Sequence, residues 1–158
     1  MKKLNLGCGN DYKEGWTNVD CIDVRKDIAH DLNKLPYPFK KDYFDEVLMK
    51  MVLEHLDNPI KVLKEVIRIS QDGAKLTIIV PHADSYANKT DIQHKTNFTE
   101  TSFNEELLKE YGLESLKLVK FEFLYKNKWK KYLPIKNALK IFLNGIYDDL
   151  LFEFRVKK

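Results

Sequence analysis

The chain has 158 residues, with 44% hydrophobic and 32% charged side chains. This balance is too apolar for a disordered chain and predicts one globular domain over residues 1–158. The formal net charge of +3 is too small to indicate a nucleic-acid-binding protein by itself. We predict a cytoplasmic protein, because the sequence has only two cysteines, no leader-like start and no apolar run of membrane-spanning length.

Seven segments have the composition or the alternation of β-strands. In chain order they are Lys3–Leu6, Trp16–Asp20, Ile28–His30, Phe44–Met49, Ala74–Val80, Leu116–Tyr125 and Leu150–Val156. The sixth segment alternates so that Val119, Phe121, Phe123 and Tyr125 share one face. Two such strands after a run of shorter buried ones favour an antiparallel pairing at the end of a parallel sheet.

Three segments between the strands have helical signals. Asn58 is an N-cap residue type directly before Pro59, and Ser102 with Glu105 matches a capping box. The helices are expected from Pro59 to a turn ended by Gly73, from near Ser102 to Gly112, and over Ile135–Leu143. Because strands and helices alternate, we predict an α/β fold: a Rossmann-like, mostly parallel twisted sheet of about seven strands, the last one antiparallel, with flanking helices.

Two glycines and two aspartates stand where the first three expected strands end. Gly7 and Gly9 follow the first strand, Asp20 ends the second, and Asp31 follows the third. Ligands of an open α/β sheet bind beyond the carboxyl ends of its strands, and glycines there let a ligand approach the backbone without a Cβ in the way. Asp20 can accept hydrogen bonds from both hydroxyls of a ribose, and Asp31 from the amine of an adenine. The pattern therefore predicts a nucleoside site.

The spacing of this motif separates two classes of nucleoside cofactor. A dinucleotide fingerprint needs a third glycine at the position of Tyr12 and an acidic residue about twenty positions on, after a full helix. Asp20 follows Gly9 by only eleven positions, which leaves no room for a long helix to hold a pyrophosphate. The spacing predicts a shortened first crossover and favours S-adenosylmethionine, which carries no phosphate, over NAD.

An ordered set of short motifs resembles the class I S-adenosylmethionine-dependent methyltransferases, in particular the compact, type-11-like members. The motifs are Leu4-Asn5-Leu6-Gly7-Cys8-Gly9, Gly15-Trp16-Thr17-Asn18-Val19-Asp20, His30-Asp31-Leu32, Leu35-Pro36, Tyr43-Phe44-Asp45-Glu46-Val47 and Val52-Leu53-Glu54-His55-Leu56. The resemblance extends over about residues 3–112. It implies a cofactor half at about 1–80, a substrate-side half at about 81–158, and S-adenosylhomocysteine as the product.

The resemblance also implies which residues bind the cofactor. Gly7, Cys8 and Gly9 would border its methionine and ribose parts, Asp20 would hold the ribose hydroxyls, Cys21, Ile22, Asp31 and Leu32 would surround the adenine, and Met49, Lys50 and Met51 would close the site near the sulfonium. Relatives commonly have a histidine at the position of Met51, so any role of that histidine in positioning substrate is missing or moved here. No metal site is expected.

Two histidines are candidate catalytic residues. An acceptor atom that loses a proton during methyl transfer needs a base nearby. His94 is the first candidate, because similar enzymes place a histidine in this region over the substrate pocket, and His55, on a short expected helix, is the second. The simpler interpretation of Glu54 and His55 is a helix start whose polar side chains face water.

The lysine-rich segment Lys126–Tyr132 leaves other functions open. Its four lysines, Trp129 and Tyr132 are typical of a solvated loop, but also of a surface for an anionic substrate, a lipid headgroup or RNA. The expected function is methyl transfer to a small-molecule acceptor: a sugar, a lipid-linked glycan or another polar metabolite. The alternatives are a non-catalytic S-adenosylmethionine-binding module and an RNA- or membrane-surface binder using this segment. Nucleic acid is not the expected partner, peripheral membrane contact is left open, and the oligomeric state is not predicted.

Overall fold

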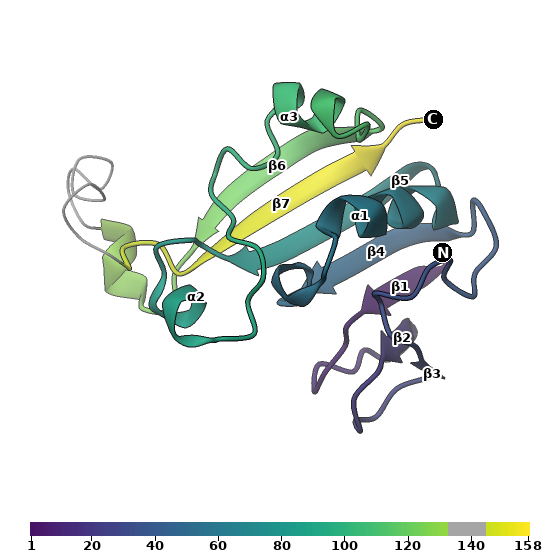
Figure 1. Cartoon of the computed structure of the whole chain (residues 1–158), viewed down its shortest axis with the longest axis horizontal. Coiled ribbons are helices and arrows are strands. Elements are labelled where there is room, and N and C mark those ends of the chain that lie inside the picture. Colours follow the sequence, from purple (N-terminus) through teal and green to yellow (C-terminus); the bar gives the residue numbers. More distant parts are fainter. Residues whose placement is uncertain (133–144) are drawn as a thin grey trace.

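The computed structural model describes residues 1–132 and 145–158, and its centre is one seven-stranded sheet (Figure 1). The strands are β1 (Lys3–Leu6), β2 (Thr17–Asp20), β3 (Ile28–Ala29), β4 (Phe44–Lys50), β5 (Ser70–Pro81), β6 (Leu116–Leu124) and β7 (Asp149–Val156). The helices are η1 (Leu53–His55), α1 (Pro59–Ile69), α2 (Tyr86–Thr90), α3 (Glu105–Glu110) and η2 (Lys128–Tyr132). The expected helix at Ile135–Leu143 lies outside the described residues.

The strand order β3-β2-β1-β4-β5-β7-β6 confirms the predicted fold class. The five strands β1 to β5 pair in parallel, while β7 is antiparallel to both of its neighbours, β5 and β6. The segment between β1 and β2 forms turns without a helix, as the shortened crossover predicted. Neighbouring parallel strands therefore end at the same edge of the sheet, next to a crossover that is only a loop.

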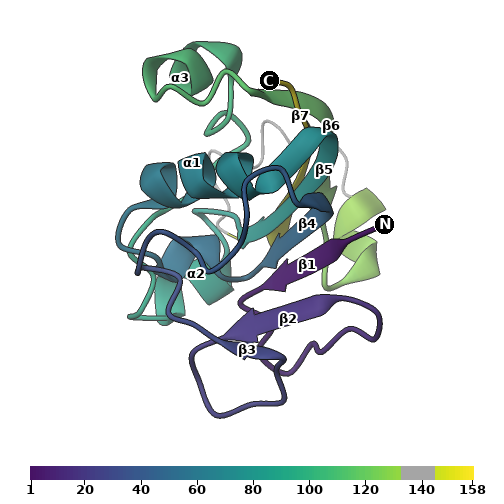
Figure 2. The same ribbon diagram turned by 90° about the vertical axis from the view of Figure 1, so that its right-hand side faces the viewer.

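Helices α1 and α3 cover the same face of the sheet (Figure 2). Helix α1 begins where its sequence predicts, because the Asn58 side chain accepts a hydrogen bond from the Lys61 N–H (2.9 Å) and Pro59 occupies the first turn. On this face, Phe103 packs edge-on against Phe152 and Phe154 of β7. The side chains of this core include Leu4, Leu6, Val47, Met49, Leu63, Val66, Leu76, Ile78, Phe152 and Phe154.

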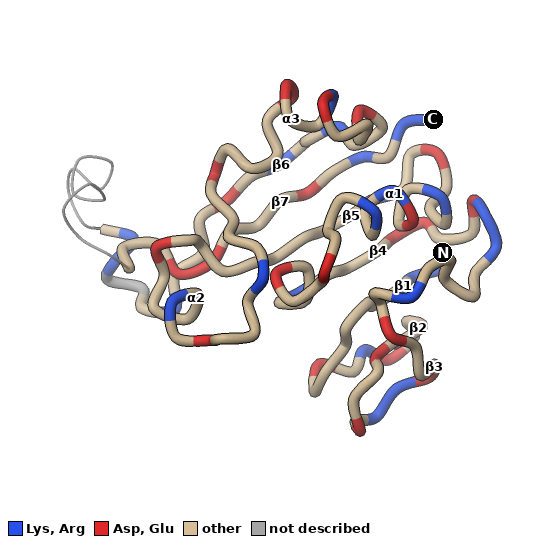
Figure 3. The backbone as a smooth tube through the Cα atoms, in the orientation of Figure 1, with Lys and Arg blue, Asp and Glu red and all other residues tan. Residues whose placement is uncertain are grey.

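The alternate residues of the same strands, which point to the other face of the sheet, include charged side chains. Lys3 pairs with Glu46 (3.0 Å), Lys75 pairs with Glu46 (3.2 Å), and Lys75 also lies 3.5 Å from Glu153. These four side chains come from β1, β4, β5 and β7, so they form a charge row across four adjacent strands; Figure 3 shows charged positions within β4 and β7. The sheet thus has one apolar face under helices and one partly exposed face with alternating charges.

Three local predictions were wrong. Helix α3 is capped by Asn104, which accepts from the Leu107 N–H (2.8 Å), while the Ser102 hydroxyl accepts from the Thr99 N–H (2.8 Å), so the helix begins at Glu105. Gly73 does not end the turn after α1: β5 already starts at Ser70, and an irregular register accommodates residues 71–74. Val119 is 53% exposed, because the β6 register shifts between Leu118 and Lys120 and breaks the alternation.

None of the helices in the described residues is long and apolar enough to cross a membrane.

Candidate functional site

A pocket of about 370 Å³ lies at the carboxyl ends of β1, β2 and β4. Its lining residues are Gly7, Gly9, Asp20, Cys21, Ile22, Asp31, Leu32, Asn33, Met51, Val52, His55, Leu56 and Gln93. Eight of the eleven expected cofactor residues are therefore brought together, along with the catalytic candidate His55. Parallel pairing explains this convergence, since it places the ends of neighbouring strands at one edge.

The glycine loop after β1 turns sharply away from the sheet. The N–H groups of Gly7 (2.8 Å) and Cys8 (3.1 Å) both donate to the Val19 carbonyl of β2, and the Gly9 N–H donates to the Asp20 carboxylate (2.7 Å). Gly7 has a φ of +67°, and a Cβ built on it would lie 2.0 Å from Cγ2 of Val52. Glycine at position 7 is therefore required both by backbone conformation and by space.

The Asp20 carboxylate is held in place by three backbone donors. Oδ2 accepts from the Gly9 N–H, and Oδ1 accepts from the N–H groups of Cys21 (2.8 Å) and Ile22 (3.1 Å). Asp20 is 8% exposed, so its orientation is fixed by these bonds rather than by solvent. A carboxylate has about four acceptor positions, so about one remains for a hydroxyl group of a ligand. This anchored carboxylate joins the tips of β1 and β2.

The neighbouring wall combines exposed and buried groups. Ile22 is 55% exposed, and Cys21 is an exposed free thiol, while Leu32 is buried. Asp31 Oδ1 accepts from the Asn33 N–H (3.0 Å), so that carboxylate is also positioned by the local backbone. This side of the pocket offers an apolar surface with a polar edge, which suits a flat heterocycle.

Three expected cofactor residues do not line the pocket. Cys8 is buried, and its thiol lies 3.7 Å from the Arg25 carbonyl; burial, followed by the nearby Asp20 charge, raises the pKa of this thiol. Met49 points into the core and is fully buried. Lys50 is exposed and pairs with Asp11 (3.0 Å). Met51, in contrast, lines the pocket and has a φ of +53°, an unusual value for a residue other than glycine.

The simpler interpretation, in which Glu54 and His55 both face water, is wrong for Glu54. Glu54 is 1% exposed, and its Oε2 has no hydrogen-bond partner among the described residues. Burial raises the pKa of its carboxyl to about 7, and the negative charges of Asp149 and Asp91 act in the same direction. The sequence signal that could have found this residue is its position between apolar Leu53 and the pocket-lining His55 on the short helix η1.

His94 does not line the pocket itself, but it packs against a residue that does. Its ring lies 4.7 Å from the ring of His55, centroid to centroid, at an interplanar angle of 67°. The neighbouring Gln93 lines the pocket. Glu54, His55 and His94 each offer one donor atom, and these atoms lie within 4.8 Å of one another. The two catalytic candidates are thus adjacent, together with a carboxylate that the sequence interpretation had missed.

The orientation of the His94 ring is set by Asn88. Nδ1 of His94 lies 3.1 Å from Oδ1 of Asn88, whose amide nitrogen donates to the Ala83 carbonyl (3.1 Å) and to Oδ1 of Asn97 (2.8 Å). Because both amide hydrogens are used, the oxygen of Asn88 faces the ring and accepts from Nδ1–H. In the neutral ring this proton on Nδ1 makes Nε2 the acceptor nitrogen, and Asp91 Oδ2 lies 3.6 Å from it.

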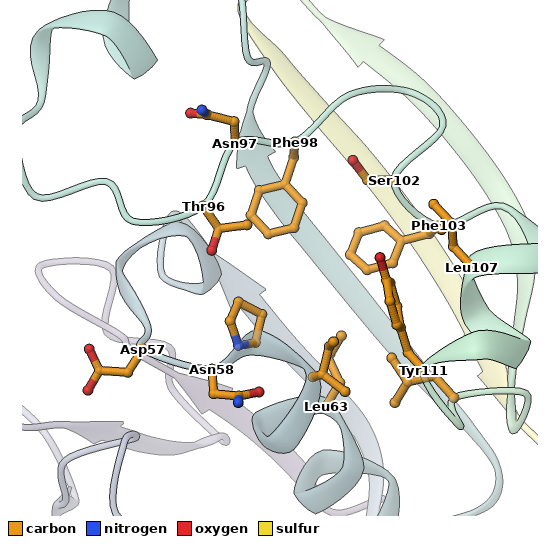
Figure 4. A pocket seen from close by; sticks show the side chains of 13 residues that line it. Asp57, Asn58, Leu63, Thr96, Asn97, Phe98, Ser102, Phe103, Leu107 and Tyr111 are labelled. Carbon is orange, nitrogen blue, oxygen red and sulfur yellow. The ribbon is translucent and has the colours of Figure 1, made fainter.

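A second cavity of about 410 Å³ lies between α1 and α3 (Figure 4). Leu63 comes from α1, Leu107 and Tyr111 come from α3 or its end, and Phe98 and Phe103 complete a mainly apolar lining. A hydrogen bond from the Asp57 N–H to Asn33 Oδ1 (2.8 Å) links the walls of the two cavities. The first cavity alone combines the strand-end glycines with the anchored carboxylate, so we assign the functional site to it.

The lysine-rich segment is partly neutralised by acidic neighbours. Lys130 pairs with Asp148 (2.7 Å) and donates to the Gly145 carbonyl (2.8 Å), and Lys126 lies 3.9 Å from Asp149. Tyr132 is 80% exposed. These ion pairs reduce the positive charge of the segment, which argues against its use as a phosphate-binding surface.

Comparison with known proteins identifies the family. The model of a family described as "Methyltransferase domain" matches residues 4–118, more than two thirds of the chain. The chain belongs to this methyltransferase family. An uncharacterised protein of Methanocaldococcus jannaschii is 33% identical over 88 residues, which cover 51% of this chain and 43% of that protein. The match to that relative therefore spans less than half of the relative's length.

Solved structures of methyltransferases share the fold of this family member. A SAM-dependent methyltransferase from Archaeoglobus fulgidus has a TM-score of 0.73 at 18% identity, over 98% of this chain and 85% of that chain. A chain from the Haloferax volcanii complex between the Trm112 methyltransferase activator and a methyltransferase has a TM-score of 0.68 at 14% identity, over 99% of this chain and 83% of that chain. The family and the fold agree with the resemblance inferred from the sequence motifs.

Proposed function

We propose that this methyltransferase-family protein transfers a methyl group from S-adenosylmethionine to a small polar acceptor. The observation that carries the proposal is the anchored Asp20 carboxylate beside the bare backbone of Gly7 and Gly9, in one pocket at the strand ends. When bound, the cofactor supplies the electrophilic methyl group of its sulfonium. The task of the protein is to align donor and acceptor and to exclude water.

The hydrogen bonds of the glycine loop favour this cofactor over a dinucleotide. The N–H groups of Gly7, Cys8 and Gly9 all donate to protein oxygens. None of these three donors remains for a pyrophosphate, and the loop leads into turns rather than a helix whose N-terminus could hold one. A nucleoside without phosphate needs neither feature. The remaining acceptor position of Asp20 suits a ribose hydroxyl.

We place the adenine against Cys21, Ile22 and Leu32, with Asp31 at its polar edge, and the sulfonium toward Met51. This arrangement is supported by the common pocket that these residues line. Cys8, Met49 and Lys50 take no side-chain role in it, because their side chains lie outside the pocket lining.

The acceptor is proposed to enter beside His55 and Gln93, two polar residues of the pocket lining. His94 Nε2 is the proposed proton acceptor, because the Asn88 contact leaves that nitrogen with a free lone pair. The polar groups of Asn33, His55 and Gln93 favour a polar acceptor such as a sugar, a lipid-linked glycan or another metabolite.

A non-catalytic S-adenosylmethionine-binding module is the second candidate. Met51 lines the pocket at the position where similar enzymes commonly have a histidine, so one group that could position an acceptor is absent from that position. In this alternative the bound nucleoside would shape a surface for a protein partner. The Haloferax volcanii neighbour was solved in complex with a methyltransferase activator, so it is an example of a protein partner on this fold.

The cofactor assignment can be tested by calorimetric titration with S-adenosylhomocysteine, with NAD as the control ligand. We expect binding of S-adenosylhomocysteine but not of NAD. Asp20→Asn keeps the shape of the side chain and removes its charge, so it should weaken binding roughly 10- to 100-fold, the value of charged hydrogen bonds. Asp23→Ala, which removes an exposed carboxylate outside the pocket, should bind like the wild type.

Equal affinity of the wild type and Asp20→Asn for S-adenosylhomocysteine would contradict the proposed site.

Incubation of the wild type with S-adenosylmethionine and a pool of sugar, glycan and metabolite acceptors then distinguishes an enzyme from a binding module, because only an enzyme forms S-adenosylhomocysteine. Once an acceptor has been identified, His94→Ala should lower the turnover rate with that acceptor without weakening cofactor binding.

A further inference from the structure

Glu54, His55 and His94 form a compact cluster of three donor groups beside the proposed cofactor pocket. One donor atom of each residue lies within 4.8 Å of the others. Glu54 and His55 come from η1, while His94 comes from the loop after α2, so the fold brings them together across about forty positions of sequence. His55 also lines the pocket, which places the cluster at the pocket wall.

One oxygen of the buried Glu54 carboxylate lacks a hydrogen-bond partner among the described residues. Glu54 is 1% exposed, and its Oε2 accepts no hydrogen bond from the described residues. A buried carboxylate is costly unless it is paired, hydrogen-bonded or bound to a metal. Neither histidine of the cluster donates a hydrogen bond to this oxygen, so a cation between the three groups would supply the missing partner.

The His94 ring is arranged as metal-bound histidines are. Its Nδ1–H donates to Oδ1 of Asn88 (3.1 Å), and Asn88 is itself held by Ala83 and Asn97. A metal-bound histidine almost always donates its other ring N–H to a carboxylate, a carbonyl or a water, and this bond fixes both its orientation and its tautomer. The side chain is 8% exposed, and its Nε2 lies 3.6 Å from Asp91 Oδ2.

We infer that Glu54, His55 and His94 bind one divalent cation of the late first transition row, such as Zn²⁺ or Co²⁺. Imidazole nitrogens suit these ions, whereas Mg²⁺ and Ca²⁺ prefer ligand sets made of oxygen alone. Three protein ligands leave coordination positions open for water or substrate. Because His55 lines the pocket, the open positions would face the space that the acceptor is proposed to occupy.

Such an ion would change how the acceptor loses its proton. A bound cation polarises an acceptor hydroxyl and lowers its pKa. It would also occupy the Nε2 lone pair of His94, so metal binding and direct proton transfer to this nitrogen exclude each other. Metal binding itself does not depend on the proposed methyl transfer, and it can be measured without an acceptor.

The test is a Co²⁺ titration of the full chain, prepared without a histidine tag and stripped with a chelator. We expect one equivalent of Co²⁺ to bind with visible d–d absorption, and Zn²⁺ to displace it. Glu54→Gln removes a buried charge at constant shape, and His94→Ala removes one nitrogen ligand; each should weaken Co²⁺ binding at least tenfold. His30→Ala is the matched control, since His30 contacts the Lys34 carbonyl away from the cluster and should leave binding unchanged.

Circular dichroism and S-adenosylhomocysteine titration of each variant establish that the fold and the cofactor pocket are intact. They also separate a failure of the metal site from a failure of the proposed function. Absence of Co²⁺ binding to the stripped wild type would overturn the inference, as would unchanged binding in Glu54→Gln and His94→Ala. Thiolate charge-transfer bands that disappear in Cys21→Ser would overturn it as well, because they would assign the ion to the exposed thiol.

Discussion

Gly7 and Gly9 both have positive φ values, but their surroundings differ. A Cβ on Gly7 would lie 2.0 Å from Cγ2 of Val52, while a Cβ on Gly9 would meet no atom within 4 Å. The first glycine is therefore constrained by packing as well as by conformation, and the second by conformation alone. Val52 is also a pocket-lining residue, so a displaced Val52 would disturb the pocket as well as the core.

Replacement of the two glycines by alanine should therefore have unequal effects. Gly9→Ala should cost about 1–2 kcal/mol of unfolding free energy, the value of the left-handed conformation for a non-glycine residue. Gly7→Ala should cost roughly 1–3 kcal/mol more, because it also overpacks the site against Val52. Urea denaturation measures both.

The double variant Gly7→Ala/Val52→Ala tests the cause of the larger effect. If the clash with Val52 is responsible, the double variant should be more stable than the sum of the two single losses predicts, giving a favourable coupling free energy. Simple additivity of the two losses would show that the contact does not matter.

At the scale of single residues, strand ends were predictable and buried polar groups were not. Gly7, Gly9 and Asp20 follow short apolar strands, and parallel pairing gathers such positions at one edge whatever the rest of the fold does. The burial of Glu54 depends instead on contacts made by residues about forty positions later, including the Lys95 N–H on its carbonyl (2.8 Å). Sequence spacing contains no information on such a contact.

At the scale of elements, Glu65 and Arg68 of α1 fasten the long connection between β3 and β4. Glu65 accepts from Arg68 (2.6 and 2.8 Å) and from the Tyr37 N–H (2.6 Å), while Arg68 also donates to the Phe39 carbonyl (3.0 Å). The Arg68 guanidinium, together with the Tyr37 N–H, holds the pKa of Glu65 below its ordinary value, against the effect of burial. The connection that carries Leu32 into the pocket is thereby attached to a core helix.

Glu65→Gln should lower the unfolding free energy by about 1–3 kcal/mol at pH 7, the range for a hydrogen bond to a charged group. Because the folded-state pKa is lowered, this contribution is complete above the unfolded pKa of about 4.3 and is lost as pH falls through the folded value. The difference between wild type and variant should therefore stay constant from about pH 7 to 5 and shrink below about pH 4.

Urea titrations at several pH values measure this difference. The matched control is Glu110→Gln, an exposed carboxylate near the end of α3, which should change stability by less than about 0.5 kcal/mol at any of them. A difference for Glu65→Gln that persists unchanged into acid would mean that the charge of Glu65 is not what stabilises the connection.

Helix starts were predictable only where one capping residue stood alone. Asn58 directly before Pro59 is an unambiguous start, and α1 uses it. Before α3, Ser102 and Asn104 are both good capping residues, and the choice of Asn104 depends on the turn that Thr99 makes with the Ser102 hydroxyl. Local propensity cannot decide between two such caps two positions apart.

At the scale of the whole molecule, the last strand joins the edge strand β6 to the parallel part of the sheet. Strand β7 lies between β5 and β6 and is paired with both along its length. Helices α1 and α3 lie on the same face and share one core with the sheet. The alternation of strand and helix signals was enough to predict this architecture, whereas the β6 bulge and the irregular start of β5 reflect register choices that no local pattern contains.

We propose that residues 1–158 unfold as one cooperative unit. Trp16 precedes β2 near one edge of the sheet, and Trp129 follows β6 near the other, so Trp16→Phe and Trp129→Phe each leave one fluorescent probe at one end. The urea midpoint reported by each tryptophan should coincide with that of circular dichroism for the same variant. Separate midpoints would divide the chain into two folding units.

The row formed by Lys3, Glu46, Lys75 and Glu153 has a consequence for how the strands find their partners. Successive side chains of a strand point to opposite faces, so a slip by one position would turn each charge inward and an aliphatic neighbour outward. A slip of β4 or β5 would break two of the three ion contacts, and a slip of β1 or β7 would break one, since each contact joins side chains on adjacent strands. The alternating charges therefore favour one register of β1, β4, β5 and β7 over registers shifted by one position.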